Sequence, residues 1–202
     1  MTLCRLQCNI EAPDMINYLE ALESISAVRE KAVVVTMATA VHGWDVVSEV
    51  KALDLPCIGS MGSASSMALG LALSRPDLKV ILIDTDGSLL MNLGSLVTIA
   101  GQSPKNLFHF VMADGVYFTT GSQILPGFQS NRLEEFANGA GYPISMEISN
   151  KIDLIEKLPD LLDSVGPVFV ALKVEQPSRD LPNFLGTTER KIRQISNEIQ
   201  KL

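Results

Sequence analysis

The chain contains 202 residues, of which 47% are hydrophobic, and its 16 basic and 23 acidic side chains give a net charge of −7. This length is enough for one well-buried domain over residues 1–202, and the acidic balance without a dense basic cluster argues against binding to nucleic acids or anionic membranes. Apolar runs such as residues 79–84 are too short to span a membrane, and no basic region precedes an apolar signal core at the N-terminus, so we expect a cytoplasmic protein.

Apolar spacing predicts helices and short buried strands in alternation. In chain order, we expect a helix over residues 12–30, a strand over 32–37, a helix over 44–53 that ends before Pro56, and a short apolar stretch leading to Gly59. Then come a helix over 66–74, a strand over 79–84, a helix over 93–101, a strand over 107–113 and a helix over 133–137. The last elements are a strand over 144–148, a helix over 152–162, a strand over 167–174 and a C-terminal helix over 187–202. This order predicts an α/β fold with a doubly wound, mostly parallel sheet covered by helices on both faces.

Two aspartate-containing loops follow predicted strands. Asp86, Gly87 and Ser88 follow the strand over 79–84, with Ser88 expected to cap the next helix, and Asp114 follows the strand over 107–113. Because ligands gather beyond the carboxyl ends of parallel strands, the two carboxylates could hold a hard cation and, through it, a phosphorylated cofactor. Each loop is also compatible with an ordinary Asp-Gly turn.

Three stretches of the chain carry a resemblance to a known family. They are GSMGSAS at residues 59–65, TDGSLLMNLG at 85–94 and ADGVYFTTGSQ at 113–123. Over about residues 30–180 the chain resembles the diphosphate-binding (PP) domain of thiamine diphosphate-dependent enzymes. Within that family it resembles the small β subunit of sulfopyruvate or phosphonopyruvate decarboxylase, whose tail is similar to SRDLPNFLGTTE at residues 178–189.

The resemblance implies a thiamine diphosphate-binding fold and a decarboxylase that uses thiamine diphosphate and Mg²⁺ on a small anionic 2-oxo acid. It also implies site residues by position. The metal ligands would be the side chains of Asp86 and Asp114 and the carbonyl of Val116. The residues that bind the cofactor would be Gly59, Ser60, Met61, Gly87, Ser88, Val116 and Tyr117. For Met61, ordinary core packing is an equally good interpretation.

The chain departs from the family pattern at three positions. Thr85, Asp114 and Phe118 stand where the pattern has glycine, asparagine and glycine. A second carboxylate beside a diphosphate adds repulsion, although aspartate is a good ligand for Mg²⁺. We therefore expect Asp114→Asn to preserve or strengthen cofactor affinity. The departures keep a non-catalytic regulatory subunit open as an alternative, beside another thiamine-dependent carboligase or oxidoreductase subunit.

In the resembling enzymes, the glutamate that activates the cofactor lies on a separate pyrimidine-binding domain, which we expect this chain to lack because its length suits one domain. The resemblance therefore implies a pyrimidine-domain (α) subunit as partner, in a hetero-oligomer with the cofactor at the subunit interface. No catalytic residue is assigned on this chain. His42, expected in the loop after the first strand, is a candidate contact for the anionic substrate.

Other conspicuous residues are interpreted as structural. We expect His109 to be a packed strand residue and Trp44 to cover apolar surface. The remaining ones are interpreted as solvated charges, Lys173 and Arg179, and as reduced thiols, Cys4, Cys8 and Cys57.

Overall fold

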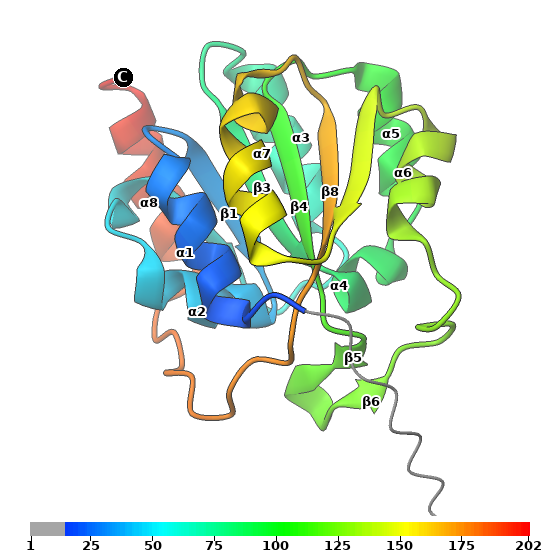
Figure 1. Ribbon diagram of the computed structural model, residues 1–202. Coiled ribbons are helices and arrows are strands. Elements are labelled where there is room, and N and C mark those ends of the chain that lie inside the picture. Colours follow the sequence, from blue (N-terminus) through cyan, green and yellow to red (C-terminus); the bar gives the residue numbers. More distant parts are fainter. Residues whose placement is uncertain (1–14) are drawn as a thin grey trace, which may run out of the picture.

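The computed structural model describes residues 15–202 and contains one six-stranded sheet (Figure 1). Every neighbouring pair of its strands is parallel, and the strand order is β2-β1-β3-β4-β8-β7. The strands are β1 (Val33–Met37), β2 (Asp54–Cys57), β3 (Val80–Thr85), β4 (Leu107–Ala113), β7 (Ile144–Ile148) and β8 (Val168–Lys173). The strand over 144–148 has the predicted bounds, and β8 lies between β4 and β7 although it comes last in the chain.

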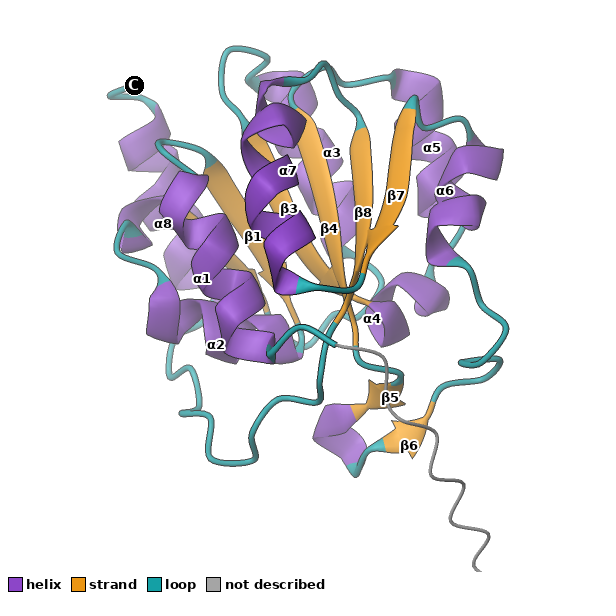
Figure 2. Ribbon diagram, viewed as in Figure 1, coloured by secondary structure: helices purple, strands orange, loops and turns teal. Residues whose placement is uncertain are grey.

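Helices cover both faces of the sheet (Figure 2), which confirms the predicted doubly wound α/β fold. One face packs against α1 (Tyr18–Val28), α2 (Thr39–Val47) and α7 (Lys151–Asp163). The other packs against α3 (Ala64–Ser74), α4 (Asp86–Met91), α5 (Ser95–Gln102) and α6 (Leu133–Ala140). The C-terminal α8 (Thr188–Ile199) buries Ile195 and Ile199 beside the edge strand β2. Because both faces are covered, β1, β3 and β4 are buried along their whole length.

The first two helices differ from the prediction. The helix expected over 12–30 begins at Tyr18, where the Asn17 side chain caps it, and residues 12–14 lie outside the described residues. The helix expected over 44–53 is α2, which begins at Thr39 and ends at Val47, followed by a separate 3₁₀ turn over Lys51–Leu53. Pro56 does not simply end a helix: it lies in β2, where an edge strand tolerates the missing N–H.

The predicted loop after β3 is also different. The short helix α4 starts directly at Asp86, so Ser88 lies inside it and cannot be the cap. The cap is Thr85, whose Oγ1 accepts a hydrogen bond of 3.4 Å from the Ser88 N–H. After β4 the chain forms an unpredicted hairpin of β5 (Val116–Tyr117) and β6 (Gln123–Ile124), joined through a 3₁₀ turn over Phe118–Thr120.

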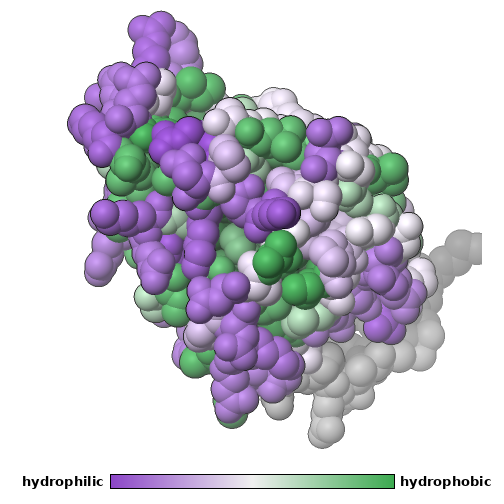
Figure 3. Space-filling model, turned by 90° about the horizontal axis from the view of Figure 1, so that it is seen from above, coloured by the Kyte–Doolittle hydropathy of each residue, from purple (hydrophilic) through white to green (hydrophobic). Residues whose placement is uncertain are grey.

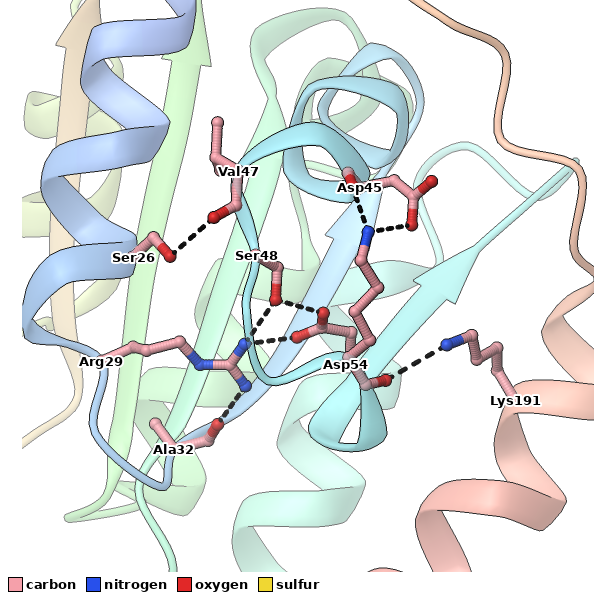
Figure 4. Close-up of polar contacts among 9 residues, drawn as sticks. Ser26, Arg29, Ala32, Asp45, Val47, Ser48, Asp54 and Lys191 are labelled. Atoms are coloured by element: carbon pink, nitrogen blue, oxygen red, sulfur yellow. Dashed lines mark hydrogen bonds and ion pairs between the residues drawn. The ribbon is translucent and has the colours of Figure 1, made fainter.

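A buried polar network ties the amino edge of the sheet together (Figure 4). Nη1 of Arg29 donates to Oδ1 of Asp54 at 2.5 Å and to Oγ of Ser48 at 3.0 Å. The Ser48 hydroxyl donates to Oδ2 of Asp54 at 2.5 Å, and Nη2 of Arg29 donates to the Ala32 carbonyl at 2.7 Å. The network joins the ends of α1 and α2 to the starts of β1 and β2, which explains why α2 ends before Ser48.

Trp44 belongs to this buried region, with the Arg29 guanidinium 5.4 Å from its ring centroid. Cys57 is a buried free thiol, whereas Cys4 and Cys8 lie outside the described residues.

Seen from above, hydrophilic and hydrophobic side chains are mixed over the surface of the described residues (Figure 3). Among residues 15–202, no helix has the length and apolarity needed to cross a membrane.

Candidate functional site

The two aspartate loops meet at the carboxyl edge of the sheet. Strands β3 and β4 are hydrogen-bonded neighbours up to Thr85 and Met112, so the residues that follow them emerge side by side. Asp86 is 3% exposed. Its Oδ1 accepts from the Gly87 N–H and its Oδ2 from the Gly115 N–H, both at 2.8 Å. The Asp86 carboxylate therefore bridges the two loops.

The two carboxylates have unfavourable surroundings when both are ionised. Burial, and then the nearby charge of Asp114, raise the pKa of Asp86 from 3.8 to about 7, against the opposing hydrogen bonds from Gly115 and Gly87. Burial raises the pKa of Asp114 to about 6, although its carboxylate accepts a hydrogen bond of 3.2 Å from the Val116 N–H. A bound cation would favour the ionised form of both groups, because it offsets their desolvation and mutual repulsion.

The glycine-rich turn is fixed to α4. Gly62 has a φ of +83°, and its N–H donates to Oγ of Ser88 at 3.0 Å. Nδ2 of Asn92 donates to the Gly62 carbonyl at 2.9 Å. Sequence reasoning missed both Gly62 and Asn92, although the second glycine of GSMGSAS was the available signal. Gly59 and Ser60 lie exposed on the same turn, and among residues 15–202 no hydrogen bond joins either of them to Asp86 or Asp114.

Other expected cofactor contacts have different geometry. Met61 is half-buried and packs against the core, as its packing interpretation predicts. The Gly87 N–H is already donated to Asp86, and the Ser88 N–H to Thr85. The Ser88 hydroxyl accepts from Gly62 and still has its own proton to donate, and the side chain is fully buried at this turn.

The β5–β6 hairpin covers the site. A Cβ atom at Gly87 would lie 2.8 Å from Cε1 of Tyr117, so only glycine leaves space for this ring. Val116 is buried, and the Phe128 ring packs against Gly115, whose φ is +78°. A cavity of about 720 Å³ opens beside the hairpin, lined in part by Asp114, Val116, Ile124 and Phe128. This volume is within the range of roughly 300–1,000 Å³ that ligand pockets occupy.

The structure does not support the interpretation of Lys173 as a solvated charge. It is half-buried at the end of β8 and lines a small crevice with Asp86 and Phe128. Its Nζ lies 3.4 Å from the Glu147 carboxylate and 5.8 Å from the Phe128 ring centroid. Its positive charge lowers the pKa of Asp86. Lys173 is therefore a cation near the site that sequence reasoning missed, because its position depends on where β8 enters the sheet.

His42 lies in helix α2 and not in a loop, which corrects the expected position. Its Nδ1 accepts a hydrogen bond of 2.9 Å from the Phe184 N–H, so one ring nitrogen already binds the connection between β8 and α8. On the same connection, the exposed Arg179 lies 5.8 Å from the Phe118 ring centroid and 3.4 Å from the Ser122 hydroxyl. Within residues 15–202, no hydrogen bond joins His42 to Asp86 or Asp114.

The donor set at the edge fits Mg²⁺ bound together with a phosphorylated ligand. The described residues contain no group of three or more His, Cys, Asp and Glu side chains that could hold a metal by themselves. Mg²⁺ in enzymes is typically held by one or two carboxylates, with water and phosphate oxygens completing six ligands. The Asp86 and Asp114 pair matches that requirement, and Val116, expected to contribute its carbonyl, follows Asp114 closely in the short strand β5.

Comparison with known proteins gives one family. Residues 34–172 match the model of the "Thiamine pyrophosphate enzyme, C-terminal TPP binding domain". The chain is 34% identical over 190 residues to sulfopyruvate decarboxylase subunit beta of Methanothermobacter thermautotrophicus, covering 92% of this chain and 97% of that protein. It is 51% identical over 84 residues to the subunit beta of Methanocaldococcus jannaschii, covering 42% of this chain and 44% of that protein.

Longer proteins match over part of their length. Phosphonopyruvate decarboxylase of Streptomyces viridochromogenes is 37% identical over 123 residues, which are 61% of this chain and 30% of that protein. A solved structure of an enzyme from Mycobacterium smegmatis described as thiamin diphosphate-dependent has a TM-score of 0.67 and 19% identity, covering 82% of this chain and 32% of that one. This structural likeness shows the fold alone. The chain thus spans nearly all of the Methanothermobacter relative and about a third of these longer ones.

Proposed function

The chain belongs to the thiamine pyrophosphate enzymes, in which it matches the C-terminal TPP-binding domain, and on that premise we propose that it is the diphosphate-binding subunit of a decarboxylase. The substrate would be a small anionic 2-oxo acid of the 3-sulfopyruvate or 3-phosphonopyruvate type, as the names of the relatives suggest. The whole chain would form a single diphosphate-binding domain. The observation that carries the proposal is the buried Asp86 carboxylate, which joins both loops and faces a second carboxylate.

The residues at the carboxyl edge of the sheet would have the following roles in this function. Asp86, Asp114 and the Val116 carbonyl would hold Mg²⁺, and the Ser88 hydroxyl would donate to a phosphate oxygen. Gly87 lets the Tyr117 ring approach closely, so Tyr117 would limit access of water to the diphosphate. When bound, thiamine diphosphate supplies the electron sink that decarboxylation of a 2-oxo acid requires. Lys173 would keep Asp86 ionised by offsetting part of the negative charge.

The function would require a second chain. Relatives of this size are named as subunit beta, whereas this chain covers 30% of the phosphonopyruvate decarboxylase it matches. These facts support a pyrimidine-domain (α) subunit that carries the activating glutamate, with the cofactor between the two subunits. The assembly would then be a hetero-oligomer, and groups on the partner would contribute to substrate recognition.

Two measurements test the proposal. Thiamine diphosphate with Mg²⁺ should raise the melting temperature of the protein, because a ligand that binds only the native form stabilises it. The chain alone should release no CO₂ from 3-sulfopyruvate or 3-phosphonopyruvate, and the pyrimidine-domain chain with Mg²⁺ and thiamine diphosphate should restore release. Turnover by the purified chain alone would refute the divided site. Absence of any melting shift with the partner present would favour a non-catalytic subunit.

A further inference from the structure

His109 is a buried histidine in β4 that lies outside the proposed metal and diphosphate site. Its side chain has 0% exposed surface, and neither ring nitrogen has a hydrogen-bond partner in the described part of the chain. The ring packs edge-on against Phe169, with 5.1 Å between the centroids and 75° between the planes. A buried polar group without a partner is destabilising, so packing alone would favour an apolar residue at this position.

The carboxylate of Asp84, in β3, lies beside the His109 ring. Nε2 of His109 is 3.8 Å from Oδ2 of Asp84, and both side chains are fully buried. Among residues 15–202, His109 is the one side chain able to carry positive charge within ion-pair distance of this carboxylate. In the sheet register, Leu82 pairs with His109 and Asp84 pairs with Val111. The contact therefore joins two adjacent strands on the same face of the sheet.

Asp84 also holds the backbone that leads into the site. Its Oδ1 accepts a hydrogen bond of 2.9 Å from the Thr85 N–H, at the last residue of β3. Thr85 then caps α4, whose first residue is Asp86. The contact between Asp84 and His109 joins β3 and β4. These two strands end immediately before Asp86 and Asp114, at the carboxyl edge of the sheet. The contact is thus placed to fix the position of one strand end relative to the other.

We propose that His109 is a positioning residue for the metal and diphosphate site. Its ring edge, with Nε2 3.8 Å from the Asp84 carboxylate, is too far for a hydrogen bond but close enough to hold that carboxylate in place by packing and electrostatics, and Asp84 orients the Thr85 backbone from which Asp86 extends. The inference rests on the proposed function, because it takes Asp86 as a metal ligand. It accounts for a histidine in a place where packing alone favours an apolar side chain. Groups that orient metal ligands without touching the metal generally contribute roughly 10–100-fold to metal affinity.

The test separates metal affinity from stability. Mg²⁺ is titrated calorimetrically into the full chain, with its partner chain and thiamine diphosphate present, and the melting temperature is measured without metal or cofactor. His109→Leu should keep or raise the metal-free melting temperature and weaken Mg²⁺ affinity roughly 10-fold or more. His109→Gln, whose amide can place a polar N–H next to the Asp84 carboxylate as the ring edge does, should retain most of the affinity. The matched control is Tyr142→Phe, which removes another buried, unpartnered polar atom near Phe169 and should leave affinity unchanged.

Asp84→Asn provides a second variant in case His109→Leu fails to fold. It should weaken Mg²⁺ affinity by itself, and His109→Leu should add little to the loss in that background. Wild-type affinity in either folded variant would overturn the inference. Loss of cooperative folding in both variants would overturn it too, because the pair would then be structural. If the wild-type complex bound no Mg²⁺ with thiamine diphosphate, the proposed function itself would fail, and the inference with it.

Discussion

The two edges of the sheet hold buried carboxylates in opposite electrostatic settings. At the amino edge, Asp54 accepts hydrogen bonds from the Arg29 guanidinium and the Ser48 hydroxyl, so an anion faces a cation and a neutral donor (Figure 4). At the carboxyl edge, Asp86 accepts from backbone N–H groups and faces Asp114, a second anion. The chain itself pairs the first carboxylate with a cation, whereas Lys173 offsets only part of the burial and repulsion at the second, and a bound cation would offset the rest.

The contrast between Asp54 and Asp86 shows when a buried charge indicates function. A buried ion pair is weak evidence for anything beyond fold specificity, because its two members satisfy each other. A carboxylate whose pKa is raised by burial and by a nearby like charge ionises less readily, and a bound cation favours its anionic form. The contrast between the edges therefore predicts different consequences for substitutions there, in stability and in metal binding.

The largest expected effect is on stability at the amino edge. Asp54→Ala leaves the Arg29 guanidinium buried without its counter-ion, and we expect the free energy of unfolding to fall by about 3–5 kcal/mol. Urea denaturation of the metal-free chain measures this. The control is Asp45→Ala, which removes an exposed ion pair with Lys51 and should change stability by less than about 1 kcal/mol. Equal losses in the two variants would show that the buried network is not special.

The next effect is on metal binding at the carboxyl edge. Asp86→Asn should weaken Mg²⁺ affinity by more than roughly 100-fold, since even groups one step removed from a metal contribute up to that amount. In the metal-free chain the substitution removes a buried negative charge but also one of the two oxygens that accept from Gly87 and Gly115, so stability should change much less than in Asp54→Ala. Calorimetric titration and thermal unfolding give the two values. A stability loss as large as that of Asp54→Ala would contradict the contrast between the edges.

A smaller effect should be seen with pH. Asp86 has a pKa near 3.8 when unfolded and about 7 in the folded chain, so the folded chain holds this proton more tightly. That stabilisation is complete below about pH 4 and is lost as the pH rises through about 7. The free energy of unfolding of the metal-free chain should fall by on the order of 2 kcal/mol between about pH 5 and about pH 8. The same slope in Asp86→Asn would assign the pH dependence to other groups.

The smallest effect is expected at Asp114. Asp114→Asn removes one of two like charges, so the metal-free chain should gain on the order of 1 kcal/mol at about pH 8. Affinity for thiamine diphosphate with Mg²⁺ should be preserved or strengthened, because an amide oxygen can replace the carboxylate without its repulsion. Denaturation and calorimetric titration check the two parts. Loss of cofactor binding would show that the carboxylate itself is needed.

Local sequence patterns predicted the fold better than the site. Apolar periodicity predicted the alternation of elements and the bounds of Ile144–Ile148, because buried strands and the apolar faces of helices leave local signals in the sequence. The end of α2 could not be predicted, since Ser48 is held by Arg29 and Asp54, which are 25 residues apart in the chain. Lys173 near Asp86 was missed for a similar reason, because strand order within the sheet leaves no local trace.

The place of β8 in the sheet has a consequence for how the protein is made. This strand, over Val168–Lys173, lies between β4 and β7, so a ribosome must synthesise most of the chain before the sheet can close. Until then β4 presents an open edge, and β7 has no neighbour in this sheet. Exposed edges of this kind pair readily with other chains, and sheets built from distant segments form slowly. We therefore expect nascent chains that end before β8 to aggregate, and full-length chains to depend on protection during synthesis.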